Sequence, residues 1–378
     1  MIDPAASFLL NAARIQGGMG DTDIPAVSQY DRDFWAGLMQ LAWTHGMSSM
    51  LYHYLKKSTP EIVPPEMLDS LKAQLSYNLN GNLRKTGELI RMLRELSSIG
   101  VDAIPYKGPA LAVLAYGDLS LREFGDLDLL INRSDYYRSQ QLLVSFGYLP
   151  EIALTEREHP GFCSFTNVMA FFNEEKSISV DLHWEMSLAY LPYSPDREGL
   201  RSRLNDAYPG GQAVKTLSIE DLLLYLCVHG AKHAWERLSW IVDVGGLIHR
   251  HPLIDWEWMQ KQAVELRVER ELSLGLHLAG ELTGVTIPGN IFRADSVVAL
   301  SSNKIRNWMF SADKHNLAAQ AIFLIRLRKG LSDKIRTLFH IIANPSVADW
   351  LALRLPAGLA FLYPFLRPFR LLRNLKNH

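Results

Sequence analysis

Two aspartates stand two residues apart in an otherwise apolar segment, where a charged side chain needs a partner. Asp126 and Asp128 belong to the run Asp-Leu-Asp-Leu-Leu-Ile. Side chains alternate between faces along a strand, so we expect both carboxylates on one face and Leu127 and Leu129 on the other. Adjacent carboxylates repel each other and resist desolvation, and Mg²⁺ commonly compensates such charge. The pattern predicts a metal site; the alternative is that one aspartate caps a neighbouring element while the other faces solvent.

A third carboxylate lies in the run Ser-Val-Asp-Leu-His-Trp at 179–184. Alternation places Asp181 and His183 on one face of this second strand. If the strand pairs beside the one that carries Asp126, the three carboxylates can bridge two Mg²⁺ ions, and Asp181 can accept a proton from an attacking hydroxyl. His183 is interpreted as a hydrogen-bonding neighbour, because Mg²⁺ prefers oxygen ligands. The alternative is an ordinary edge strand with a solvated polar face.

Two cationic side chains precede these aspartates. Lys107 and Gly108 end a predicted strand and open a helix, where free backbone N–H groups and a glycine can seat a phosphate. The alternative for this dipeptide is a plain strand–helix turn. Arg122 lies four residues before Asp126. It can reach a triphosphate, or it can pair with a surface carboxylate.

A second cationic group lies at a predicted helix end and contains His229, Lys232, His233, Trp235 and Arg237. Cationic and aromatic side chains at one place can hold phosphates and stack on a base. The alternative is that the cations complement the negative helix C-terminus and that the tryptophan belongs to the core.

The elements that must position these residues change in period along the chain. Apolar spacing predicts helices at 31–57 and 65–98, then strands and short helices to about 190, and helices again from Ser218, which opens a capping box with Asp221. We predict three regions: N-terminal helices at 1–98, an α/β core at 99–210 and a C-terminal helical domain at 211–378. In the middle region, strands are expected at 101–106, 126–131, 163–172 and 177–184, and helices at 109–116 and 134–146. In the C-terminal domain, helices are expected at 238–250, 255–267, 268–283 and 294–330.

Bulk composition describes a folded protein with no electrostatic preference for nucleic acid. The 378 residues include 39 basic and 40 acidic side chains, and 48% are hydrophobic. Only Cys163 and Cys227 are present, and the N-terminus lacks a basic region of the signal-peptide kind, so a cytoplasmic protein is expected. The aromatic and basic tail at 350–376 is compatible with weak contact to a membrane surface. The alternative, which we favour, is that the tail packs on the helical domain.

Taken in order, these residues resemble the uncharacterised nucleotidyltransferase family of bacteria, a branch of the DNA polymerase β-like superfamily. The segments that carry the resemblance are 107–111, 116–117, Arg122, 125–130, 180–184 and 229–243. The resemblance implies an α+β fold, with a small mixed sheet as the nucleotidyltransferase core between N-terminal helices and a larger C-terminal helical domain. It implies that Gly108 is the phosphate-binding turn, and that Asp126, Asp128 and Asp181 hold two metal ions.

The implied reaction is attack of an acceptor hydroxyl on the α-phosphate of a nucleoside triphosphate, with release of pyrophosphate. The acceptor is expected to be a small molecule, sugar or peptide rather than a nucleic acid. The chain departs from the superfamily at Pro109, where a serine or second glycine is usual. Phosphate binding is therefore expected to depend on Lys107, Arg122 and the cluster at 232–237. The alternative function is a catalytically silent nucleotide-binding or regulatory protein.

Overall fold

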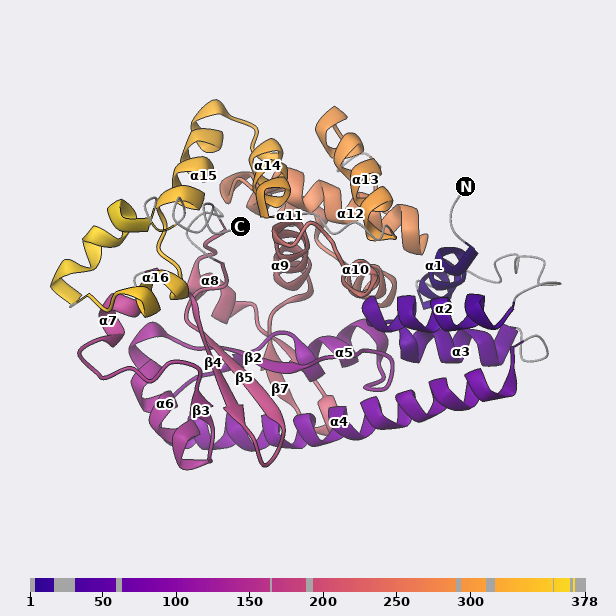
Figure 1. Cartoon of the computed structure of the whole chain (residues 1–378), viewed down its shortest axis with the longest axis horizontal. Helices are drawn as coiled ribbons and strands as arrows, with labels where there is room; N and C mark the ends of the chain where they lie inside the picture. The colour runs from indigo at the N-terminus through magenta and orange to yellow at the C-terminus, as the bar shows by residue number, and fades with distance from the viewer. Residues whose placement is uncertain are drawn as a thin grey trace.

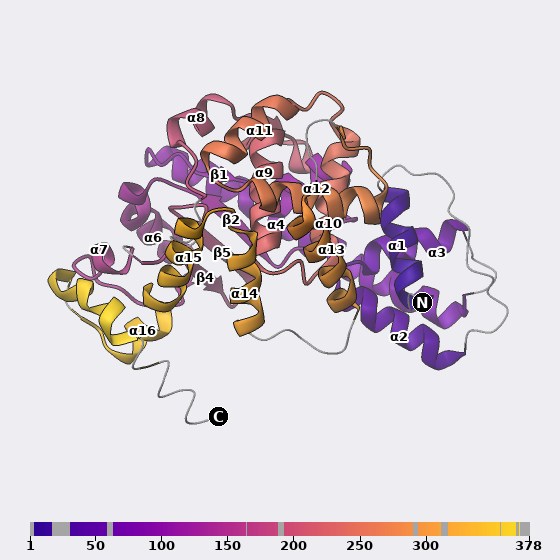
Figure 2. The same cartoon turned by 90° about the horizontal axis from the view of Figure 1, so that it is seen from above.

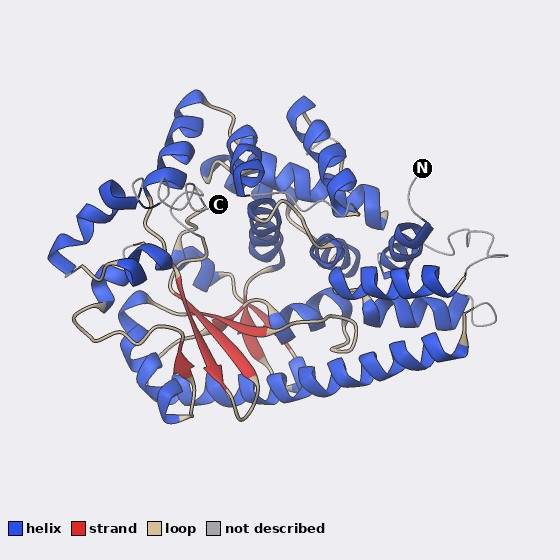
Figure 3. Ribbon diagram, viewed as in Figure 1, coloured by secondary structure: helices blue, strands red, loops and turns tan. Residues whose placement is uncertain are grey.

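The computed structural model describes residues 4–16, 31–58, 63–163, 165–187, 193–289, 294–310, 317–355, 357–367 and 370. A five-stranded mixed sheet lies among many helices (Figure 3). The protein therefore has the α+β architecture that the sequence predicts. No helix in these described ranges combines the length and apolarity that crossing a bilayer requires.

The sheet has the strand order β1-β2-β5-β4-β3. Its strands are β1 (Ile104–Pro105), β2 (Asp126–Leu130), β3 (Leu149–Pro150), β4 (Val168–Asn173) and β5 (Ile178–His183). The central pair, β2 and β5, is parallel, and the other pairs are antiparallel. The predicted strand at 163–172 is wrong in its first half, because α7 (His159–Phe162) and a turn precede β4.

Helices cover one face of the sheet. The long helix α4 (Pro65–Ser98) runs beneath the strands, and α6 (Tyr136–Ser145) lies beside it (Figure 1). Leu127 and Leu129 of β2 point to this side, where the alternation of the sequence places them. They join one buried cluster with Val180 and Leu182 of β5 and with Leu89, Met92 and Leu96 of α4. The aspartates of β2 therefore face the opposite side.

In the described part of the N-terminal region, three helices precede α4. They are α1 (Pro4–Gln16), α2 (Arg32–Thr44) and α3 (Ser48–Ser58). The single helix predicted at 31–57 is wrong, because Gly46 adopts a left-handed φ of 65° and ends α2. Such a glycine commonly ends a helix, and the chain then restarts as α3. The α4 bounds match the prediction.

The C-terminal helices lie over the aspartate side of the sheet (Figures 1 and 2). Ser218 caps α9 by accepting a hydrogen bond from the Asp221 amide, as the capping pattern predicts. The predicted helix at 294–330 is two helices, α13 and α14. The other elements from β1 to α14 are α5 (Gly108–Tyr116), η1 (Arg133–Asp135), α8 (Arg197–Ser202), β6 (Asn205–Ala207), η2 (Pro209–Gly211), β7 (Val214–Thr216), α9 (Ile219–Lys232), α10 (Leu238–Arg250), α11 (Trp256–Glu265), α12 (Glu269–Thr283), α13 (Ser296–Met309) and α14 (Leu317–Leu327).

The C-terminal segment contains α15 (Leu331–Ala343), α16 (Val347–Ala352) and η3 (Ala357–Leu362). Trp350 and Tyr363 are fully buried and pack around Phe165, which belongs to the same core as the sheet. The tail thus packs on the α/β core, which corrects the expectation that it packs on the helical domain. Phe369, Arg373 and Lys376 of the predicted tail lie outside the described residues.

Candidate functional site

The three predicted metal-binding carboxylates lie on adjacent strands. Asp128 of β2 is in register with Asp181 of β5, and Asp126 is in register with Ser179. Neighbouring strands are about 4.8 Å apart, so the carboxylates of Asp128 and Asp181 project side by side from one face. Asp128 is buried, whereas Asp126 and Asp181 are half-buried. We call Asp126, Asp128 and Asp181 the carboxylate triad.

Asp128 is the most heavily contacted member of the triad. Lys107 Nζ donates a hydrogen bond to Asp128 Oδ1 at 3.0 Å, and His183 Nε2 lies 3.3 Å from the same oxygen. The other oxygen, Oδ2, is buried without a partner among the described residues. A buried carboxylate oxygen with no donor is costly, and a bound cation would satisfy it.

Ligand atoms of Asp128, Asp181 and His183 lie within 4.8 Å of one another. This grouping fits a divalent metal ion, with the orphaned Oδ2 of Asp128 as one available ligand. His183 belongs to this grouping, whereas the sequence interpretation made it a hydrogen-bonding neighbour and not a ligand. Two carboxylates with further oxygen donors suit Mg²⁺, and the imidazole nitrogen also suits transition metals.

The pKa values of the triad show that nearby cations do not compensate two of its three carboxylates. Burial raises the pKa of Asp181 to about 7, and the negative charges of Asp126 and Asp128 add to this. Burial and then Asp128 also raise the pKa of Asp126. Burial acts in the same direction on Asp128, but Lys107 and His183 outweigh it and hold its pKa well below the ordinary value. Lys107 thus neutralises one carboxylate and leaves the other two poorly compensated.

The face of α9 that looks toward the sheet closes the site from above. Tyr225, His229, Lys232 and His233 line a cavity of about 240 Å³ together with the carboxylate triad, Lys107 and His183. We call it the triad cavity. Burial lowers the pKa of His233 to about 4 and that of Lys232 to about 8, with nearby cations adding to both shifts. The histidines are therefore neutral at pH 7, and the lysines carry the positive charge.

Tyr225 is a lining residue that the sequence analysis did not identify as part of the site. It lies four residues before His229 and eight before His233, so helical spacing puts all three on one face. Its ring packs edge-on against Tyr106 at 5.0 Å and lies beneath Lys107 Nζ at 5.5 Å. The i, i+4, i+8 repeat of ring-bearing side chains was the signal that could have identified it.

Gly108 begins α5 directly after Lys107, and its φ is +52°. A Cβ at this position would lie 3.3 Å from the carbonyl oxygen of Asp126. The glycine is thus required by a left-handed backbone conformation and by the close approach of this turn to β2. That approach is what brings Lys107 within reach of Asp128.

The remaining predicted residues occupy other places. Arg122 Nε donates to both carboxylate oxygens of Asp243 in α10, at 3.0 and 3.1 Å. Trp235 is fully buried against Gly230 and Gly275 in the helical core, so its ring is inaccessible to a base. Arg237 precedes α10 and is exposed. Arg122 and Arg237 line a second cavity of about 790 Å³, which we call the basic cavity because Arg84 and Lys85 also line it.

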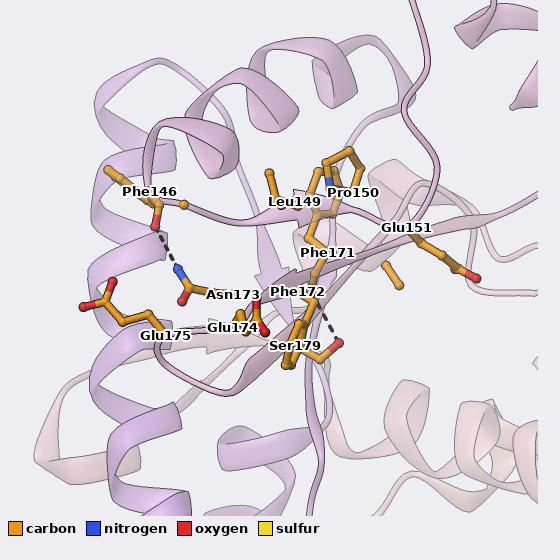
Figure 4. A pocket seen from close by; sticks show the side chains of 12 residues that line it. Phe146, Leu149, Pro150, Glu151, Phe171, Phe172, Asn173, Glu174, Glu175 and Ser179 are labelled. Carbon is orange, nitrogen blue, oxygen red and sulfur yellow. Dashed lines mark hydrogen bonds between the residues drawn. The ribbon is translucent and has the colours of Figure 1, made fainter.

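A further hollow lies at the outer edge of the sheet, between β3, β4 and the loop after α6 (Figure 4). Asn173 donates to the carbonyl of Phe146 across one end of it, and Glu151, Glu174 and Glu175 are its charged lining residues. Its lining includes no cation and none of the carboxylate triad. It offers nothing to bind a phosphate, so we exclude it from the candidate site.

Comparisons with known proteins agree with this site in part. A search of curated proteins found no match. Among solved structures, an antigenic nucleotidyltransferase-like protein from Paracoccidioides brasiliensis is 16% identical; the match covers 56% of this chain and 96% of that one, with a TM-score of 0.31. That score is too low to carry an argument. The sequence model of a family described as uncharacterised nucleotidyltransferase matches residues 31–284. This match spans most of the chain and includes the carboxylate triad, Lys107 and the lining face of α9, so the protein belongs to the uncharacterised nucleotidyltransferase family.

Proposed function

We propose that the protein is a Mg²⁺-dependent nucleotidyltransferase that moves a nucleoside monophosphate from a nucleoside triphosphate to an acceptor hydroxyl, with release of pyrophosphate. The observation that carries the proposal is the triad cavity itself. It joins three carboxylates that lack sufficient counter-charge with two lysines, Lys107 and Lys232. Carboxylates that attract metal and cations that attract phosphate are the two requirements of this reaction.

Asp126, Asp128 and Asp181 are proposed to hold two Mg²⁺ ions, with His183 beside them. Bound there, the metal supplies charge neutralisation for the transferring phosphoryl group. Lys107, directly before α5, and Lys232, at the end of α9, are proposed to hold the phosphates. Asp181 is proposed to receive the proton of the acceptor hydroxyl at a carboxylate oxygen, a role worth about 10²–10⁴-fold in rate for a positioned base.

Incubation with α-labelled nucleoside triphosphates, Mg²⁺ and a cell extract tests this proposal. We expect label to appear in an acceptor, and we expect equimolar pyrophosphate. Tight Mg²⁺-dependent nucleotide binding without any labelled product would instead support the alternative, a catalytically silent nucleotide-binding or regulatory protein. Absence of nucleotide binding would contradict both.

Nucleotide binding is expected to take up protons near pH 8.5 through Lys232. Its pKa is lowered from 10.5 to about 8 in the free protein, by burial and then by Lys107. Phosphate charges would restore the protonated form, so calorimetry in buffers of different ionisation enthalpy should report proton uptake. The same shift makes the free protein more stable as the pH rises from about 8 to 10.5, because only the unfolded chain still binds this proton.

The Lys232→Gln variant should lose the proton uptake. Lys215→Gln is the control, since Lys215 is 61% exposed and paired with Asp206 on the β6–β7 hairpin. Equal proton uptake by the wild type and Lys232→Gln would exclude Lys232 as a phosphate-binding residue.

We also propose a contact with an anionic lipid surface, through α15. Its large apolar side chains point outward: Leu331 is 74% exposed and Phe339 is 63% exposed. The small residues Thr337 and Ala343 are the buried ones. Lys334 and the exposed Arg336 supply the charge that anionic lipid attracts. The full outward set is Leu331, Ile335, Leu338, Phe339 and Ile342.

Most of the described side chains in the aromatic and basic tail at 350–376 contact other parts of the protein. Trp350 and Tyr363 are buried, and Arg367 and Arg370 pair with Asp349. Phe361 and Phe365 remain exposed. The proposed contact therefore centres on α15 rather than on the tail.

Serine at both Leu338 and Phe339 is expected to lower co-sedimentation with vesicles of phosphatidylcholine and phosphatidylserine by about tenfold or more. Burial of each of these side chains contributes about 1.5 kcal/mol or more. Leu253→Ser is the control, because Leu253 is 94% exposed on a different loop. Vesicle binding that survives the double change, or self-association of the wild type without lipid, would contradict a lipid partner.

A further inference from the structure

The basic cavity contains more positive charge than the protein uses internally. Arg84, Lys85 and Arg237 line it, and no ion pair joins any of them to a carboxylate in the described part of the chain. Lys85 Nζ instead donates to the backbone carbonyl of Phe124 at 2.7 Å. The whole chain has a net charge of −1. The positive charge is therefore a local property of this cavity.

The acidic residues of the basic cavity are already occupied. Asp243 accepts hydrogen bonds from Arg122 and from the Tyr116 hydroxyl. Glu123 accepts from the Ser48 amide at 3.1 Å. Arg122 Nη1 is a buried donor with no partner among the described residues, although its Nε is bonded. Among the described residues, three lining cations without an ion pair (Arg84, Lys85 and Arg237) thus face one carboxylate without an ion pair, Glu123, and this excess of positive charge favours an anionic ligand.

Aromatic rings form part of the same lining. Trp43 is 62% exposed and Tyr77 is 75% exposed, although both are large apolar side chains. Trp240 lines the cavity beside them. Rings of this kind stack on planar groups and on cationic side chains. A ligand with a planar ring would cover surface that is otherwise unfavourably exposed.

The basic cavity adjoins the triad cavity. Gly125, the residue before Asp126, lines it. The ring of Trp240 lies 5.3 Å from that of His229 and 5.5 Å from that of His233, and both histidines line the triad cavity. Lys85 is also close enough for Asp126 to act on its pKa, which burial lowers and Asp126 raises. The basic cavity therefore lies next to the Asp126 end of the carboxylate triad.

The volumes of the two cavities and the direction of nucleophilic attack indicate different roles for them. The triad cavity, at about 240 Å³, is smaller than the roughly 300–1,000 Å³ usual for a complete ligand. In phosphoryl transfer the attacking and leaving oxygens lie in line on opposite sides of phosphorus. The nucleophile must therefore approach the phosphorus from the side opposite the pyrophosphate. The basic cavity lies beside the Asp126 end of the aspartate pair, since its lining includes Gly125.

We infer that the basic cavity is the acceptor site, and that the acceptor is a small molecule that carries a negatively charged group and a planar ring beside its reacting hydroxyl. This inference rests on the proposed nucleotidyl transfer and deepens it. The attacking hydroxyl oxygen forms the new bond to the α-phosphorus, the bond to the bridging oxygen of pyrophosphate breaks, and the hydroxyl proton passes to Asp181. Arg84 and Arg237 hold the anionic group.

The first test uses phenyl phosphate as an anionic ring and benzyl alcohol as its neutral counterpart, measured by saturation-transfer NMR on the full chain. We expect phenyl phosphate to bind the wild type at least tenfold more tightly than benzyl alcohol. The Arg84→Gln/Arg237→Gln variant should lose this preference. The control variant Arg94→Gln/Lys215→Gln removes two exposed positive charges elsewhere and should keep it. Equal binding of the two probes, or binding that survives in Arg84→Gln/Arg237→Gln, would overturn the inference.

The second test uses a low-molecular-mass extract that is divided on an anion-exchange column before reaction with α-labelled nucleotides and Mg²⁺. Label should enter a compound from the retained fraction. The Arg84→Gln/Arg237→Gln variant should raise the KM for that fraction at least tenfold while kcat and the Kd for the nucleotide change less than threefold. An acceptor in the unretained fraction would overturn the inference, and so would weakened nucleotide binding in this variant, which would assign the cavity to the nucleotide.

Failure of the proposed function has a different signature. It appears as absence of Mg²⁺-dependent nucleotide binding in the wild type, whatever phenyl phosphate does. The Asp126→Asn/Asp181→Asn variant tests the triad cavity without changing the basic cavity. It should lose nucleotide binding and keep phenyl phosphate binding.

Discussion

Asparagine at both Asp126 and Asp181 is expected to lower nucleotidyl transfer by about 10³-fold or more while it stabilises the metal-free protein. Two of three proposed metal-binding carboxylates are lost, and metal neutralisation of a phosphoryl group supplies several kcal/mol, with each 1.36 kcal/mol worth about tenfold in rate. Lys107 keeps its partner Asp128, so no buried cation is left unpaired. Labelled-product formation measures the first effect and thermal unfolding measures the second.

The stabilisation should depend on pH in a defined direction. The pKa of Asp181 is raised from 3.8 to about 7 by burial and by Asp126 and Asp128. Between these values the folded wild type binds a proton that the unfolded chain has released, so wild-type stability falls as the pH rises through this window. The advantage of the variant is therefore absent below pH 3.8 and complete above about pH 7.

Two outcomes would contradict this account. A variant that retains wild-type turnover would show that the carboxylate triad does not bind the catalytic metal. A variant that is destabilised at pH 8 in the absence of metal would show that the two aspartates are structural, and the activity loss would then have no catalytic meaning.

Alanine at Asp243 is expected to destabilise the fold by about 3–5 kcal/mol, the usual cost of leaving one member of a buried ion pair unpaired. Asp243 is 1% exposed and Arg122 is 11% exposed, and Tyr116 donates to the same carboxylate at 2.7 Å. The pair joins the loop before β2 to α10, which lie 121 residues apart in the chain. Denaturant unfolding with a linear extrapolation to water measures the loss.

A matched surface pair provides the control. Lys215 and Asp206 lie 2.9 Å apart but are 61% and 43% exposed, so Asp206→Ala should change stability by about 1 kcal/mol or less. Replacement of both buried partners, as Arg122→Met with Asp243→Leu, should restore much of the loss, because a buried pair can be replaced by apolar residues at little cost. Similar losses in Asp243→Ala and Asp206→Ala would show that burial does not govern this pair.

The sequence predicted correctly those features that depend on the local backbone alone, namely side-chain alternation in a strand, a helix cap and helix bounds. Alternation along β2 places Asp126 and Asp128 on one face and Leu127 and Leu129 in the core, as the sequence predicts. The capping residue Ser218 and the bounds of α4 follow from equally local patterns. The break at Gly46 was missed because the apolar spacing continues across it, although a glycine is the residue most able to end a helix.

Contacts between residues far apart in the chain could not be predicted from the sequence. Arg122 has the chemistry to bind a phosphate, but its Nε is bonded to Asp243, and nothing within its own segment indicates that partner. Trp235 has the chemistry to stack on a base, but it fills space beside Gly230 and Gly275. The residue type determines which ligands a side chain could bind. Its burial and its partners in the fold determine whether it is accessible to them.

The amino-acid sequence by itself determined that this protein has an Asp-x-Asp strand with a lysine–glycine turn before it, and a family likeness that the family model confirms. Only the tertiary structure decided that Asp128 lies beside Asp181, that Lys107 reaches Asp128, and that the Tyr225 face of α9 closes the cavity. It also divided the cations between the triad cavity and the basic cavity. The physical reason is that the direction of a side chain along a strand or helix is fixed by its own backbone, whereas its partners are fixed by packing between segments far apart in the chain.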